Sequence, residues 1–243
     1  MTKIDDHLRC LRELSEWVPY LLKHSGLPGP RANLELAYAV AEAGDIKQFE
    51  QFLTVEADEN TPEVFVLFCG IVGLGRLSVR QPDLFNRLRP YTSDPRWRIR
   101  EAVATGLQLA GDQDMELLLQ EMKTWIQGNG YEKRAAAAAM AEPRLLKEEK
   151  HAQQALQILD QITASMESGE RSRDDSFKVL KQGMAYCWSV AVTALPETGK
   201  PLMEKWLDSS DKEILWVMKE NFKKSRLVKM DAAWVEKCTK RLT

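Results

Sequence analysis

The sequence contains few cysteines and histidines, the residues that most often bind zinc or, for cysteine, form disulfides. Its four cysteines are widely scattered and form no CxxC pair: Cys10, Cys69, Cys187 and Cys238. This distribution argues against a zinc site or a disulfide framework and is typical of small apolar residues in a reducing compartment. The three histidines are far apart, and none lies in a HExxH or triad-like motif: His7, His24 and His151. We therefore predict surface histidines, no metal site, no cofactor and no catalytic residues.

Long apolar runs and a strong net charge are also missing. The N-terminus carries Asp5 and Asp6 where a secretory signal would need apolar residues, and no apolar run approaches the length of a membrane span. The formal net charge of −2 gives the whole chain no bias toward nucleic acid or anionic membranes. We expect a cytoplasmic protein that has no membrane partner.

The glycine-rich segment 70–75 lacks the features of a nucleotide-binding loop. It has no preceding strand and no Walker Lys-Ser/Thr, and its glycines do not follow the order of the dinucleotide fingerprint. Small residues in a helix allow a neighbouring helix to approach closely, and the alanine run 135–139 has the same explanation. We predict tight helix packing at both segments.

Apolar residues at helical spacing are abundant, and no segment alternates like a strand. The periodicity predicts an all-α chain of roughly a dozen helices. The first runs over residues 4–23 and is interrupted at Pro19. The others are expected near 34–43, 45–53, 62–74, 84–88, 95–110, 112–125, 131–141, 143–166, 176–195, 202–207, 212–222 and 232–242.

Residues 94–112 contain the clearest of these helices. Asp94 is a suitable N-cap, Pro95 suits the first helical position, and Gly111 suits the residue after the C-cap. Apolar residues recur between them at the 3.6-residue period: Ile99, Ala102, Val103, Gly106, Leu107 and Ala110.

This segment has degenerate counterparts elsewhere in the chain. Segment 61–64 aligns with 94–97, which places Gly73 on Gly106; Tyr131 falls on Trp97 and Arg134 on Arg100, and segment 210–213 can be laid over 94–97. Spacings of about 30–45 residues fit a HEAT or armadillo type of solenoid. We predict an α-α superhelix of antiparallel helix pairs, with residues 1–243 as one repeat domain and an exposed, mobile charged loop near 167–175. An irregular bundle would also explain the helices, but it predicts no recurring Asp/Thr-Pro start.

Asp94-Pro95 followed by Arg100-Glu101-Ala102-Val103 resembles the second helix of HEAT repeats. Arg100 lies six residues after Asp94, so it can reach back toward the turn or across to a neighbouring repeat. The resemblance implies a curved, right-handed stack that serves as a binding scaffold.

The pattern Asp94-x-x-Trp97-x-x-Arg100-x-Ala102 is also similar to a segment of the HEAT-like DNA alkylation repair glycosylases. That resemblance implies an aromatic-lined concave cleft for DNA, with Arg100 near the phosphate backbone and Trp97, Arg100 and Ala104 on an open helix face. The family's catalytic carboxylate in the preceding repeat aligns with Leu67, and a further family Trp falls within residues 135–139. The resemblance therefore implies a shared fold and DNA binding, and it leaves enzymatic activity open.

Two basic clusters add to these candidates. One surrounds Trp97 and the other lies near the C-terminus: Arg87, Arg89, Arg96, Arg98 and Arg100, then Lys219, Lys223, Lys224, Arg226 and Lys229. Such runs form either a solvated face or a phosphate-binding edge. An arginine one turn away can stack on Trp97; alternatively, the Trp packs between repeats and the Arg bonds to a turn. The predicted binding residues are Trp97, Arg100, Arg96, Tyr131, Arg134, Lys223, Lys224 and Arg226.

These features support two functional hypotheses. The favoured one is a non-enzymatic scaffold that binds a protein or peptide on its concave face. The alternative is a nucleic-acid-binding relative of the alkylation repair glycosylases, whose binding would weaken as salt rises.

Overall fold

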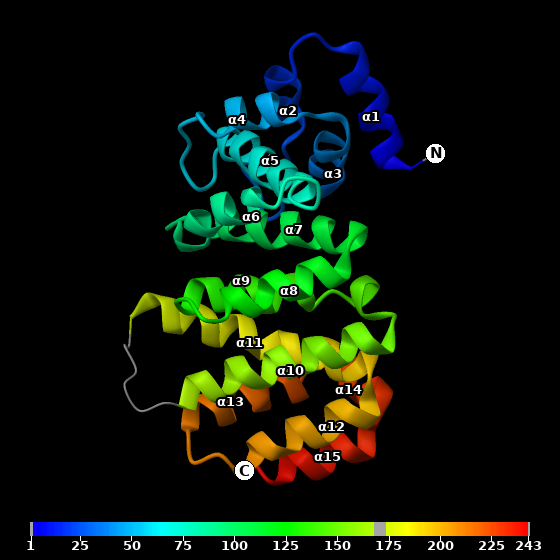
Figure 1. Cartoon of the computed structure of the whole chain (residues 1–243), viewed down its shortest axis with the longest axis vertical. Helices are drawn as coiled ribbons and strands as arrows, with labels where there is room; N and C mark the ends of the chain where they lie inside the picture. Colours follow the sequence, from blue (N-terminus) through cyan, green and yellow to red (C-terminus); the bar gives the residue numbers. More distant parts are fainter. Residues whose placement is uncertain (1, 168–173, 243) are drawn as a thin grey trace. The chain divides into compact units, whose positions relative to one another are not determined.

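The computed structural model describes residues 2–167 and 174–242, and this part of the chain is all-α, without β-strands (Figure 1). The predicted all-α class is confirmed, and the superhelical stack of helix pairs stays a prediction. By its internal contacts the chain divides into two compact units, Met1–Asp114 and Met115–Thr243, here called unit 1 and unit 2. One repeat domain over the whole chain stays a prediction. Residues 168–173 of the predicted charged loop lie outside the described residues.

The helices of unit 1 are α1 (Lys3–Glu13), α2 (Val18–His24), α3 (Leu34–Ala43), α4 (Ile46–Phe52), α5 (Pro62–Leu77), α6 (Asp83–Leu88) and α7 (Trp97–Gln113), with a 3₁₀ turn at Arg89–Ser93. Those of unit 2 are α8 (Met115–Trp125), α9 (Gly130–Met140), α10 (Glu149–Glu167), α11 (Asp175–Ala194), α12 (Pro196–Lys205), α13 (Lys212–Phe222), α14 (Ser225–Met230) and α15 (Ala232–Lys240). Two further 3₁₀ turns, at Pro143–Leu146 and Trp206–Asp208, also belong to unit 2.

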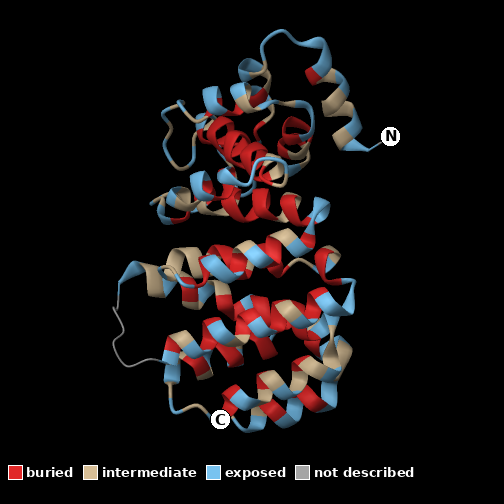
Figure 2. Ribbon diagram, viewed as in Figure 1, coloured by how far each residue is buried: buried red, intermediate tan, exposed pale blue. Residues whose placement is uncertain are grey.

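Helix α5 forms the core of unit 1. Every residue from Val64 to Gly75 is buried, as the red ribbon of α5 in Figure 2 shows. A Cβ atom added at Gly75 would lie 2.4 Å from the Cα of Gly106 in α7, so the two backbones are in direct contact. The prediction of tight helix packing at segment 70–75 is confirmed at this glycine.

Helices α3, α5 and α7 are linked at similar sequence intervals. Arg76 donates a hydrogen bond to Glu42, 34 residues earlier, and the amide of Gln113 donates to the Arg76 carbonyl, 37 residues earlier. Arg87 in α6 donates to Glu50 in α4, again 37 residues earlier. The turn before α5 also contacts the start of α7. Because α5 and α7 are therefore linked at both ends, they run in the same direction.

Unit 2 also contains a pair of parallel helices, α11 and α13. Lys181 in α11 pairs with Glu213 in α13 at 2.9 Å, and the Ser189 N–H donates to Asn221 at 2.8 Å, both across 32 residues. The two links are in register, so α11 and α13 are parallel. The buried Asn221 amide also donates to the carbonyls of Met184 and Val217. This side chain therefore holds α11 and α13 together through three backbone groups.

The structure corrects several predicted helix boundaries. Helix α7 begins at Trp97, so Asp94 and Pro95 lie in the turn before it, and Gly111 lies inside the helix rather than after it. The predicted first helix is two helices, and Pro19 lies at the start of the second. Asp174 rather than Ser176 caps α11. No helix is predicted over the residues that form α14.

Candidate functional site

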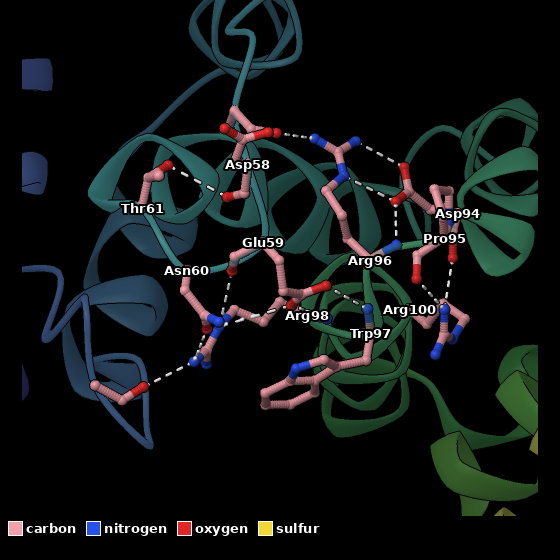
Figure 3. A network of polar contacts seen from close by, with 12 residues as sticks. Asp58, Glu59, Asn60, Thr61, Asp94, Pro95, Arg96, Trp97, Arg98 and Arg100 are labelled. Atoms are coloured by element: carbon pink, nitrogen blue, oxygen red, sulfur yellow. Dashed lines mark hydrogen bonds and ion pairs between the residues drawn. The ribbon is translucent and has the colours of Figure 1, made fainter.

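The start of α7 is held by the turn that precedes α5. Glu59 accepts hydrogen bonds from the backbone N–H groups of Trp97 at 2.9 Å and Arg98 at 3.3 Å (Figure 3). A carboxylate at this position satisfies two of the four N–H groups that a helix start leaves unpaired and interacts favourably with the helix dipole. The cap that the sequence assigned to Asp94 is therefore supplied by a residue 38 positions before Trp97.

Asp94 instead fixes the side chain of Arg96. Its carboxylate accepts hydrogen bonds from Nε of Arg96 at 2.9 Å and from Nη2 at 2.7 Å, and Arg96 also donates to the carbonyl of Ala57 at 2.8 Å. Burial alone would raise the pKa of Asp94, but the hydrogen bonds from Arg96 outweigh it and lower that pKa. Both side chains therefore serve to anchor the turn before α7.

Arg98 is the most buried charged side chain of this region, at 5 % exposure. Its guanidinium donates to the carbonyl of Gly29 at 2.8 Å, to Asn60 Oδ1 at 3.1 Å and to the carbonyl of Glu59 at 3.2 Å. It also lies 4.5 Å from the centre of the Trp97 ring. Arg98 thus joins two loops to α7 and supports the indole from one side.

The predicted role of Arg100 is resolved by its contacts. Its Nη1 donates to the carbonyls of Asp94 at 2.6 Å and Pro95 at 2.9 Å, which is the predicted reach back to the turn. The guanidinium of Arg98 lies over the Trp97 ring. The predicted open face is wrong at Ala104, which is buried at 3 % exposure.

Trp97 forms one wall of a pocket inside unit 1. The pocket has a volume of about 750 Å³ and lies among α1, α3, α5, α7 and the loop before α3. Trp97 is 46 % exposed and Leu34 is 40 % exposed, although both are large and apolar. The lining residues are Ile4, Pro30, Arg31, Ala32, Leu34, Glu35, Tyr38, Phe68, Trp97, Arg98, Glu101 and Thr105. We call this cavity the Trp97 pocket.

The charged groups around the Trp97 pocket differ in how far they are already engaged. Arg98 is bonded to two loops, and Glu101 has partners. Arg31 is exposed, and within residues 2–167 and 174–242 neither its side chain nor that of Glu35 forms a hydrogen bond or ion pair, although Glu35 acts electrostatically on His7. The pocket therefore combines an apolar interior with one available cation and one available carboxylate.

The remaining predicted binding residues lie in unit 2. Arg134 packs over Gly183, where an added Cβ would lie 2.8 Å from its Cγ. Lys223 pairs with Glu220, Lys224 precedes α14, and Tyr131 is half-buried at the start of α9. Arg226 donates to the hydroxyl of Tyr186 at 2.7 Å and lines a second groove. Arg134 and Arg226 therefore contact neighbouring turns of α11, at Gly183 and Tyr186, and a shared binding site for these residues stays a prediction.

The prediction of surface histidines is wrong: His151 is buried, and His7 and His24 are half-buried. Sequence reasoning also misses a cluster of titratable side chains between α1 and α2. His7 Nδ1 lies 2.9 Å from the Tyr20 hydroxyl, and the His24 ring lies 4.4 Å from the Tyr20 ring. Burial and a hydrogen bond with Cys10 raise the pKa of Tyr20 to about 12. A helical hairpin brings the two histidines together across 16 intervening residues, and no local motif marks that approach.

His7 predicts a pH dependence of unit 1 stability. Burial, together with the nearby His24, lowers the pKa of His7. The unfolded chain therefore binds more protons than the folded one near the ordinary histidine pKa of about 6.5, and the free energy of unfolding falls as pH falls through that value. Thermal unfolding between neutral and mildly acidic pH should show this loss, and His7→Gln should reduce it. An unchanged pH slope in the variant would contradict the assignment.

Within the described ranges, no group of three or more His, Cys, Asp or Glu side chains is arranged to hold a metal ion. None of the helices in that part of the chain has the length and apolar character that crossing a membrane requires. A scan against protein-family models and a search of curated proteins each found no match to the chain.

Proposed function

We propose that the protein is a non-enzymatic scaffold of HEAT or armadillo type, and that the Trp97 pocket binds a segment of a partner protein. The observation that carries this proposal is the exposed indole of Trp97 on the wall of an apolar pocket. Tryptophan, with tyrosine and arginine, is enriched among the few residues that contribute most of the binding energy at protein–protein interfaces.

The spacing of contacts inside each unit supports a repeat architecture. In unit 1, links between alternate helices, or between the turns that precede α5 and α7, span 34 to 39 residues. In unit 2, α11 and α13 are linked across 32 residues, and α10 and α12 across 45. Equivalent helices of consecutive repeats run parallel at a roughly constant interval, and each contacts its neighbours. The parallel α5–α7 and α11–α13 pairs have this relation.

The Trp97 pocket has the properties of a peptide-binding surface. Its volume of about 750 Å³ lies within the range of ligand clefts. Arg98 holds the indole from one side, so little conformational entropy is lost when a partner packs against it. We propose that an apolar side chain of the partner enters between Trp97 and Leu34, with a carboxylate of the same segment beside Arg31.

The arrangement of charge favours a protein segment over nucleic acid. Phosphate binding needs cations that are free to replace counterions. Arg96, Arg98 and Arg100 each donate to carbonyl or carboxylate groups of their own unit. Two glutamates, Glu35 and Glu101, also line the pocket. DNA binding at Trp97 therefore stays the second hypothesis.

Trp97→Ala tests the proposal. Short peptides selected from a random library against the immobilised full chain would be titrated by fluorescence anisotropy. We expect Trp97→Ala to weaken binding by about tenfold or more, because it removes a large anchor from the pocket wall.

Trp216→Ala is the matched control, since Trp216 is 37 % exposed and lies in unit 2. Its affinity should equal that of the wild-type chain. An equal loss of peptide affinity in both variants would show that the Trp97 pocket is not the binding site. Peptides that bind Trp97→Ala as tightly as the wild-type chain would show the same. Salt-dependent binding of duplex DNA that Trp97→Ala and Arg100→Ala both weaken would favour the second hypothesis instead.

A further inference from the structure

Unit 2 contains a groove in which every charged lining residue is a cation. It has a volume of about 560 Å³ and lies among the 3₁₀ turn at Pro143–Leu146, the C-terminal part of α11, and α14. Lys147, Arg226 and Lys229 line it, and its lining contains no Asp or Glu. We call it the basic groove.

The two lysines of the basic groove are available to bind an anion. Lys147 and Lys229 are exposed, and neither forms an ion pair within the part of the chain that the structure describes. Arg226 bonds to the Tyr186 hydroxyl at 2.7 Å, and its guanidinium lies 4.7 Å from the centre of the Tyr186 ring. These contacts fix Arg226 without neutralising it. Three like charges around one groove repel one another, and an anion that binds there relieves this repulsion.

The rest of the lining indicates which anion fits. Leu146 and Val190 are apolar and are 3 % and 2 % exposed, and Pro143 and Ala194 line the groove with them. The Ser225 hydroxyl forms no hydrogen bond among the described residues and can donate to a ligand. A base would need an aromatic face for stacking, and the nearby Tyr186 ring is already in contact with Arg226. An apolar interior with cations around it suits a carboxylate-bearing peptide.

We propose that the basic groove binds an acidic segment of a partner protein, with an apolar side chain against the exposed Pro143 and Ala194 and carboxylates beside Lys147, Arg226 and Lys229. This site lies in unit 2 and does not depend on the Trp97 pocket. It gives the protein a second recognition surface, which selects a partner by negative charge.

The probe for this site is a fluorescein-labelled peptide of glutamates interspersed with leucine and phenylalanine. It would be titrated into the full chain by anisotropy at low salt. The wild-type chain should bind it, and the affinity should fall as salt is raised. The double variant Lys147→Glu/Lys229→Glu should weaken binding by about tenfold or more.

Lys212→Glu/Lys237→Glu is the matched control. Both lysines are exposed, lie in unit 2 outside the groove, and give the same change in net charge. Affinity within about twofold of the wild type is expected for this control and for Trp97→Ala, because neither alters the groove. Loss of binding in Trp97→Ala alone would place the acidic peptide in the Trp97 pocket and overturn the proposal.

Three further results would overturn the basic groove as an acidic-peptide site. The first is equal weakening in both double variants, which would mean that only net charge matters. The second is the absence of binding to the acidic probe at low salt. The third is tighter binding of single-stranded oligo-dT that Lys147→Glu/Lys229→Glu abolishes, which would assign the groove to nucleic acid.

Discussion

Replacing Arg98 with alanine is expected to lower the free energy of unfolding of unit 1 by about 3–5 kcal/mol, because the change leaves polar partners of a buried charge without a donor. Arg98 is 5 % exposed and donates to Gly29, Glu59 and Asn60 in two separate loops. Each orphaned buried acceptor costs about 1–3 kcal/mol. Urea denaturation of the full chain, followed by hydrogen exchange of unit 1 peptides, measures the loss.

Arg87→Ala is the matched control for Arg98→Ala. Arg87 forms an ion pair with Glu50 at 2.9 Å, and the two side chains are 45 % and 47 % exposed. An exposed pair of this kind contributes about 0–1 kcal/mol. The two variants remove the same side chain from the same unit, so their difference isolates the effect of burial. A loss of less than about 1 kcal/mol in Arg98→Ala would mean that the network is not needed to hold the loops.

Replacing Gly75 with alanine should produce the second large effect. Helix propensity alone would favour alanine by about 1 kcal/mol. The added Cβ would lie 2.4 Å from the Cα and carbonyl carbon of Gly106, which cannot move aside as a flexible side chain can. Overpacking of this kind costs about 1–3 kcal/mol or more. We expect unit 1 to lose about 2–3 kcal/mol, measured by the same denaturation.

Gly106→Ala serves as the comparison for Gly75→Ala. A Cβ atom added at Gly106 would lie 3.1 Å from the Cα of Gly75, so a shift of a few tenths of an ångström relieves the clash. Gly106→Ala should therefore cost less than Gly75→Ala. The reverse order, or no loss in either variant, would contradict the close contact between α5 and α7.

Much of the fold was predictable because the helices have a strong period and clear caps. The range 34–43 matches α3, and 212–222 matches α13. Helix caps are harder to predict, because a capping side chain can come from a distant part of the chain. Asp94 has the composition of a cap, but Glu59 occupies the cap position because the turn before α5 packs against α7. Whether a carboxylate caps its own helix or another depends on tertiary contacts that the local sequence does not contain.

The candidate site was predictable only in part. Trp97 was singled out, and it lies in the pocket of unit 1. Arg98 looked like one member of a basic cluster, yet its contacts extend 69 residues back to Gly29. The free Arg31 and the exposed Leu34 carry no motif, and they become candidates only when the loop before α3 is placed beside α7. Pocket residues brought together from distant segments have no periodic signal in the sequence.

Fluorine NMR of the full chain can show whether Trp97 contacts the bound partner segment. The chain has seven tryptophans, and labelling with 5-fluorotryptophan gives each its own resonance. The variants Trp97→Phe and Trp216→Phe identify the resonances of Trp97 and Trp216. Titration with a selected peptide should shift the Trp97 resonance and leave that of Trp216 unchanged, with a midpoint equal to the Kd from anisotropy. A Trp97 resonance that stays fixed while the peptide saturates the protein would mean that Trp97 does not contact the bound peptide.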